Sequence, residues 1–229
     1  DLLRPDSVSP EQDTARNELR NALNLNFAKP RRSTNTEANS YVFDTAEVLL
    51  KQREIFDTTK YPQKEKDRYG DHQLGQHMLI GRKLLEAGCR FVKVNSYGWD
   101  THGDHFNGTV SLVNRFDQAF AAVLEDLEAT GQLEHTLVIA MSEFGRTPRI
   151  NGHAGRDHWP KVSCAFMAGG RMNHGQMIGA SDKHAAEPAD RPVHMGEVHA
   201  TLYQHMGLDP NATTISDLTG RPQYLVDGW

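Results

Sequence analysis

Four side chains that could bind a metal ion fall close together in the sequence: Asp100, His102, Asp104 and His105. Gly98 precedes them and Gly103 lies among them, and glycine lets a backbone approach a bound ion closely. Carboxylate oxygen combined with imidazole nitrogen suits zinc, manganese or iron better than a metal that prefers sulfur. The alternative is a polar loop with Asx turns that leads into a helix capped by Asn107 or Thr109.

A second polar cluster, residues 142–148, contains Glu143 and Arg146. The carboxylate could bind a metal ion while the arginine holds an anion beside it, because a planar guanidinium matches phosphate or sulfate oxygens two at a time. The alternative is a local ion pair at a turn.

A third cluster, residues 151–160, contains the step Asp157-His158 among small residues. One of these side chains could bind a metal ion while the other lies behind a ligand, since a carboxylate commonly orients a ligating imidazole. The alternative is a glycine-rich surface turn. Carboxylate, histidine and arginine recur in the three clusters together, and this combination favours a metal-assisted site for a phosphate or sulfate group.

The chain around these clusters alternates between helical and extended patterns. Apolar residues at helical spacing predict three helices, over residues 74–85, 112–127 and 195–206. Short apolar runs predict three strands, over residues 89–94, 136–141 and 163–168. The run 136–141 is typical of a strand buried on both faces of a parallel sheet. We therefore expect an α/β fold, layered, with a mostly parallel sheet and flanking helices, and with the polar clusters where strands meet loops.

The first 68 residues have a more polar pattern. They predict a weak helix over residues 11–25, a loop over residues 29–40 and a short helix over residues 44–57. We expect residues 1–68 to form a helical or irregular appended segment, and residues 69–229 to form the α/β domain.

Composition narrows the functional classes. The chain has 229 residues, a formal net charge of −5, 12 histidines and two cysteines. Two cysteines cannot form a disulfide framework, and no apolar run reaches the roughly 18 residues of a membrane-spanning helix. The acidic charge and the lack of a long basic cluster argue against nucleic acid as the partner.

Four blocks resemble, in order, the signature motifs of a bacterial family abundant in planctomycetes, the DUF1501 domain of unknown function. The blocks are GWDTH at 98–102, SEFGRTP at 142–148, GRDHWP at 155–160 and DRPV at 190–193. That family is grouped with sulfatases and alkaline phosphatases. The resemblance therefore implies an alkaline phosphatase-like sheet and bound divalent metal: zinc, calcium, magnesium or manganese.

The resemblance also implies roles for the matching residues. The implied metal ligands are Asp100, His102, Glu143 and His158. The implied catalytic residues are Arg146, as the clamp on an anion, and Asp157 beside the last ligand.

Members of that family carry, near their start, a glycine-rich block that ends in an Asp-Thr pair and supplies the nucleophile. Nothing before Tyr69 matches this block, because Asp44-Thr45 lies in a helical context without glycine. We therefore expect the chain to be the carboxyl-terminal portion of such a fold, with its N-terminal segment missing.

The leading functional hypothesis is a metal-dependent hydrolase of phosphate or sulfate esters, with a small-molecule or polysaccharide anionic ester as substrate. One alternative is a non-catalytic binding or scaffold protein of the cell envelope that keeps the fold. Another is a phosphotransferase of the phosphoglycerate-mutase type. The family resemblance implies a periplasmic or secreted location.

Overall fold

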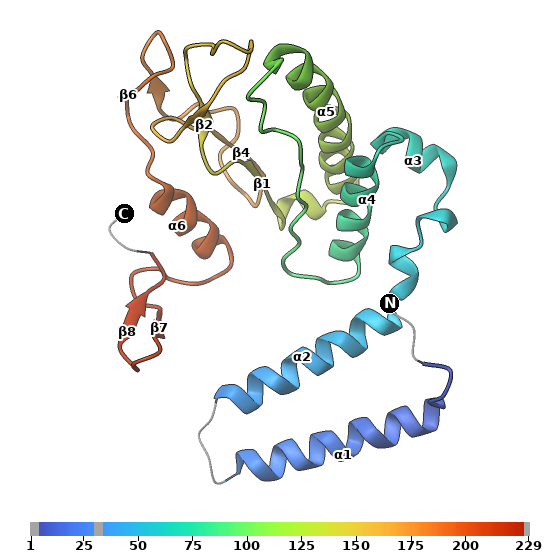
Figure 1. Ribbon diagram of the computed structural model, residues 1–229. Coiled ribbons are helices and arrows are strands. Elements are labelled where there is room, and N and C mark those ends of the chain that lie inside the picture. The colour runs from blue at the N-terminus through green and yellow to red at the C-terminus, as the bar shows by residue number, and fades with distance from the viewer. Residues whose placement is uncertain (1–4, 30–33, 227–229) are drawn as a thin grey trace. The chain divides into compact units, whose positions relative to one another are not determined.

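The computed structural model describes residues 5–29 and 34–226 (Figure 1). The chain divides into two compact units, one made of residues 1–62 with 83–92 and the other of residues 63–82 with 93–229. Among the helices that the structure describes, none is both long and apolar enough to cross a membrane. The division that we predicted after residue 68 stays a prediction.

The first unit contains a helical hairpin, α1 (Pro10–Ala28) and α2 (Thr34–Lys51), followed by two short 3-10 helices, η1 (Arg53–Phe56) and η2 (Thr58–Lys60). Ser9 begins α1 with a capping box, since its hydroxyl accepts from the backbone N–H of Gln12 and the Gln12 side chain accepts from the Ser9 N–H. The helix predicted over residues 11–25 is therefore confirmed.

The loop predicted over residues 29–40 is wrong where the structure describes it, because residues 34–40 belong to α2. Residues 30–33 of that prediction lie outside the described residues. The two helices run side by side (Figure 1), with the Asn24 amide 3.2 Å from the Ser40 hydroxyl and the Arg20 guanidinium 4.1 Å from the centre of the Phe43 ring. Contacts between the helices therefore support helix where the polar composition alone suggested a loop.

The helices of the second unit are α3 (Gln63–Tyr69), the part of α4 (Gln73–Glu86) up to Arg82, α5 (His105–Ala129) and α6 (Met195–His205). A short 3-10 helix, η3 (Gln132–Glu134), follows α5. These elements confirm the three predicted helices, and Gly131 follows α5 with a φ of 73°, as the predicted glycine stop requires.

The beginning of α5 differs from the prediction. The helix begins at His105 after Asp104, so neither Asn107 nor Thr109 caps it. The backbone N–H groups of Asp104 and His105 donate instead to the carbonyls of His153 and Ala154. Carbonyl groups of a distant loop thus accept hydrogen bonds from the first N–H groups of this helix, and no local sequence pattern reveals that contact.

The core of the second unit lies along α3, α4 and α5. Its fully buried side chains include Tyr69, Leu79 and Leu127. The Tyr69 hydroxyl donates to the Asp126 carboxylate at 2.7 Å, and Arg82 contacts the same carboxylate at 3.2 Å. Apolar packing and a buried polar cluster therefore hold these three helices together.

Four two-stranded sheets complete the second unit, and all four are antiparallel. They pair β1 (Leu137–Met141) with β4 (Ala165–Gly169), β2 (Gly145–Arg146) with β3 (His158–Trp159), β5 (Ala180–Ser181) with β6 (Pro188–Asp190), and β7 (Thr214–Ser216) with β8 (Pro222–Tyr224).

Strands β1 and β4 confirm two of the three predicted strands, but the parallel orientation expected for β1 is wrong. A parallel pair needs a long crossover, usually through a helix, and the described residues 142–164 contain no helix. The predicted strand over residues 89–94 is also wrong, since the structure assigns no strand there. Within residues 5–29 and 34–226 every sheet has two strands, and the alkaline phosphatase-like layered fold stays a prediction.

Candidate metal centre

Two segments of the second unit bring the candidate side chains together. Asp100 and His102 lie on the loop that precedes α5, and His158 lies in β3. In the β2–β3 ladder His158 is paired with Arg146. Paired residues of an antiparallel ladder project from the same face, so this register directs both side chains toward Asp100.

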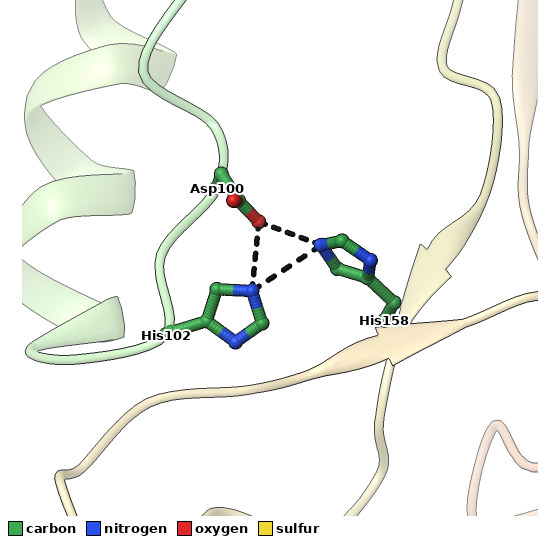
Figure 2. A group of neighbouring side chains, drawn as sticks. All are labelled: Asp100, His102 and His158. Carbon is green, nitrogen blue, oxygen red and sulfur yellow. Dashed lines mark hydrogen bonds and ion pairs between the residues drawn. The ribbon is translucent and has the colours of Figure 1, made fainter.

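Three ligand atoms converge at this point (Figure 2). The Oδ1 atom of Asp100 lies 3.0 Å from Nε2 of His102 and 2.8 Å from Nε2 of His158. The two Nε2 atoms are 3.2 Å apart. All three side chains are exposed, so a solvent ion and a ligand can reach the group.

These distances are those of hydrogen bonds and an ion pair among the three side chains, and they would also suit a divalent cation. Neighbouring ligands with bonds of about 2.1 Å lie about 3.0 Å apart in an octahedral complex and about 3.4 Å apart in a tetrahedral one. The observed separations of 2.8, 3.0 and 3.2 Å are closer to one face of an octahedron. Two imidazoles and one carboxylate suit zinc, manganese or iron, whereas calcium and magnesium prefer oxygen ligands throughout.

Asp157 determines which nitrogen of His102 is available. The Asp157 Oδ1 atom lies 2.7 Å from Nδ1 of His102. An ionised carboxylate can only accept, so in this contact Nδ1 carries the proton and Nε2 is the nitrogen that faces Asp100. The hydrogen bonds from His102 and Asn151 lower the pKa of Asp157. Asp157 thus orients the ring so that Nε2, 3.0 Å from Asp100 Oδ1, is the nitrogen that a cation could use.

Arg146 binds protein groups at this site. Its Nη2 atom donates to Asp100 Oδ1 at 2.7 Å and to the Trp99 carbonyl at 2.8 Å, and Nη1 donates to the Arg156 carbonyl at 3.3 Å. Hydrogen bonds from His158 and Arg146 lower the pKa of Asp100 to about 2. Arg146 thus orients Asp100 and, after His158, helps to lower its pKa, while its predicted role as an anion clamp stays a prediction.

Other candidates lie apart from the three ligands. Within the described residues, the only group with metal-ligand geometry consists of Asp100, His102 and His158, so Glu143, which lies exposed in a bend after β1, is outside it. His105 lies in α5 with its Nδ1 atom 2.6 Å from the Thr101 hydroxyl. The structure therefore brings together three of the four predicted ligands and both predicted catalytic residues.

Two residues of this site were not predicted from the sequence. The Phe144 ring lies against the His158 imidazole, with 4.3 Å between their centres. The Asn151 amide donates both to the His102 carbonyl, at 3.0 Å, and to Asp157 Oδ1, at 3.1 Å. In a sequence, an asparagine before a glycine normally indicates only a turn. The contact between Asn151 and the loop of His102 becomes visible only in the folded chain.

No curated protein and no solved structure matches the chain. A family model described as a protein of unknown function, DUF1501, matches residues 1–228. The match covers the three polar clusters and also the first 68 residues, over which the sequence motifs are weaker. The chain therefore belongs to the DUF1501 family.

Proposed function

We propose that the chain binds one divalent cation through Asp100, His102 and His158 and acts as a metal-dependent hydrolase of phosphate or sulfate esters. The observation that carries the proposal is the convergence of three ligand atoms within 3.2 Å of one another, with Asp157 behind one of them. A cation held there would act as a Lewis acid toward an ester oxygen and would lower the pKa of a bound water.

The chain's own residues have separable tasks in this proposal. Asp157 holds His102 with Nε2 available, and Arg146 holds Asp100 as a carboxylate. Phe144 packs against the ring of His158 and restricts its rotation. The ligand side chains are thus oriented before the ion arrives, which reduces the entropy lost on binding.

The resemblance of the four sequence blocks extends the proposal to the fold, the location and the substrate. It supports an alkaline phosphatase-like fold for the wider domain of residues 69–229, and a periplasmic or secreted location. It also supports an anionic ester, either a small molecule or part of a polysaccharide, as the substrate.

One observation favours a rival, a metal-binding protein of the cell envelope without turnover. Arg146 already donates to Asp100 and to two backbone carbonyls, and Glu143 lies outside the ligand group. Neither side chain is therefore directed toward an ester bound at the cation in this arrangement.

Metal binding is tested by calorimetry with zinc and manganese on the metal-free chain. We expect one site, lost in Asp100→Ala and His158→Ala and kept in His174→Ala, which removes an exposed histidine from another loop. Loss of at least tenfold in affinity is expected for each ligand variant. Binding that is absent in the natural chain, or equal in all four proteins, would overturn the proposed site.

Turnover is tested on the metal-loaded chain with an aryl phosphate, an aryl phosphodiester and an aryl sulfate. Hydrolysis that disappears in His158→Ala supports the hydrolase. Metal binding without hydrolysis of any substrate supports the binding protein instead. Transfer of the phosphoryl group to an added alcohol, without net release, would indicate a phosphotransferase.

A further inference from the structure

The side chain of Asn151 makes four hydrogen bonds at the edge of the metal centre. Its Nδ2 atom donates to the His102 carbonyl and to Asp157 Oδ1, at 3.0 and 3.1 Å. Its Oδ1 atom accepts from the backbone N–H groups of His153 and Gly155, at 2.9 and 3.0 Å. A side-chain amide has two N–H donors and two lone pairs, so this arrangement uses all of its capacity.

The loop that carries Asn151 packs directly on the loop that carries His102. The Arg156 N–H donates to the Thr101 carbonyl at 3.1 Å. A Cβ atom added to Gly155 would lie only 1.9 Å from the His102 carbonyl oxygen, so the backbones meet without room for a side chain. Asn151 therefore joins two backbone segments that are already in contact, and Asp157 is bound to both.

His102 lies between two carboxylates, so in its neutral form either Nδ1 or Nε2 could carry the proton. Asp157 can accept a proton from Nδ1, at 2.7 Å, while Asp100 can accept one from Nε2, at 3.0 Å. Only the first tautomer leaves Nε2 free as a ligand. The tautomer therefore depends on how firmly the Asp157 oxygen is held in front of Nδ1.

We infer that Asn151 is a positioning residue that selects the metal-binding tautomer of His102. It donates to the same Asp157 oxygen that faces Nδ1, and it also holds the His102 backbone through the carbonyl. One amide thus fixes both partners of the Asp157–His102 hydrogen bond. The inference rests on the proposed metal site, and it assigns the control of that site to a residue that binds no metal.

Two substitutions separate this role from support of the loop. Asn151→Asp keeps an oxygen that can accept from His153 and Gly155, but it loses both donors and places a carboxylate against Asp157. Asn151→Ala loses all four hydrogen bonds. Asn107→Ala is the matched control, because Asn107 donates only to Asp104, beside the site, and contacts none of the three ligands.

The first measurement uses the metal-free chain at a pH where its histidines are neutral. Nitrogen-15 chemical shifts of the His102 ring distinguish the two tautomers directly. We expect the Nδ1–H form in the natural chain and in Asn107→Ala, and a shift toward the Nε2–H form in both Asn151 variants. A His102 tautomer that is the same in all four proteins would overturn the inference, as would a change in Asn151→Ala alone.

The second measurement is the zinc affinity of the same proteins. Loss of a residue that supports a metal ligand typically costs about 10–100-fold in affinity, and we expect this loss in both Asn151 variants. The negative charge that Asn151→Asp introduces would by itself strengthen cation binding, so weaker binding in that variant cannot be a charge effect. If the natural chain binds no zinc, the proposed function fails, while the tautomer measurement still tests the role of Asn151.

Discussion

Asp126 is the residue whose removal should most clearly destabilise the unit that carries the metal centre. Its carboxylate accepts from Arg68 at 2.5 Å and from the Tyr69 hydroxyl at 2.7 Å, and it lies 3.2 Å from Nε of Arg82. The Arg82 side chain is only 6% exposed and that of Asp126 is 15% exposed. Asp126→Ala would therefore leave a buried guanidinium with less compensating charge.

The size of the effect follows from this burial. Breaking a buried ion pair by removing one partner costs about 3–5 kcal/mol. Arg82 also pairs with Glu65, and Asp126 keeps some contact with water, so the lower end applies, about 3 kcal/mol. For a unit of this size each kcal/mol changes the melting temperature by about 2–4 °C, so we expect a decrease of about 6–12 °C.

The neighbouring Glu125 provides the matched control. It pairs with the same Arg68, at 2.9 Å, but its side chain is 67% exposed. An exposed ion pair contributes about 0–1 kcal/mol, so Glu125→Ala should change the melting temperature by about 4 °C or less. Thermal and urea unfolding followed by tryptophan fluorescence measures both variants, because Trp99 and Trp159 lie in this unit. Equal losses in the two variants would refute the assignment of Asp126 to a buried cluster.

Three further predictions concern pH, backbone packing and metal. Burial raises the pKa of Asp126, but hydrogen bonds and nearby arginines outweigh burial and lower this pKa overall. The contribution of Asp126 to stability is therefore present above its unfolded pKa and is lost as the pH falls through its folded pKa. The difference in unfolding free energy between the natural chain and Asp126→Asn should accordingly shrink as urea titrations move from pH 6 to below about pH 3. Gly155→Ala should lower both the melting temperature and the zinc affinity, because its Cβ would collide with the His102 carbonyl, whereas Gly152→Ala, whose Cβ meets nothing within 4 Å, should change neither. Zinc at 100 times its dissociation constant should stabilise the folded chain by about 2.7 kcal/mol, seen as a rise of about 5–10 °C in melting temperature that is absent in His158→Ala.

The sequence predicted the longer elements of the second unit well. Helices α4, α5 and α6 follow a helical apolar period, and glycines follow α4 and α5 at 88 and 131 with positive φ. Strands β1 and β4 were identified from apolar runs. These elements are recognisable because their patterning reflects burial along one short segment, which a local window contains.

Strand direction and pairing were not predictable in the same way. The run 136–141 is apolar whichever way its neighbour runs, so composition could not distinguish a parallel from an antiparallel partner. The run 89–94 is equally β-branched and aromatic, yet it forms no strand, because a strand requires a partner that supplies backbone hydrogen bonds. The β2–β3 ladder, only two residues long in each strand, gave no periodic pattern at all.

The residues of the candidate metal centre likewise differ in how far the sequence could predict them. Asp100, His102 and His158 were candidates because histidine and carboxylate side chains indicate ligand chemistry, and the family resemblance singled them out, together with Glu143, from the other such side chains. Asn151 was missed because an amide indicates no particular chemistry until its partners are known, and its partner His102 lies 49 positions away in the chain. A candidate ligand can thus be recognised from its type, whereas a residue that positions such a ligand can be recognised only from the folded contact. Substitutions at the residues that hold the ligands in place would therefore be the hardest to interpret from sequence in other members of the family. Asn151→Asp tests most directly whether such a residue acts separately from the ligands.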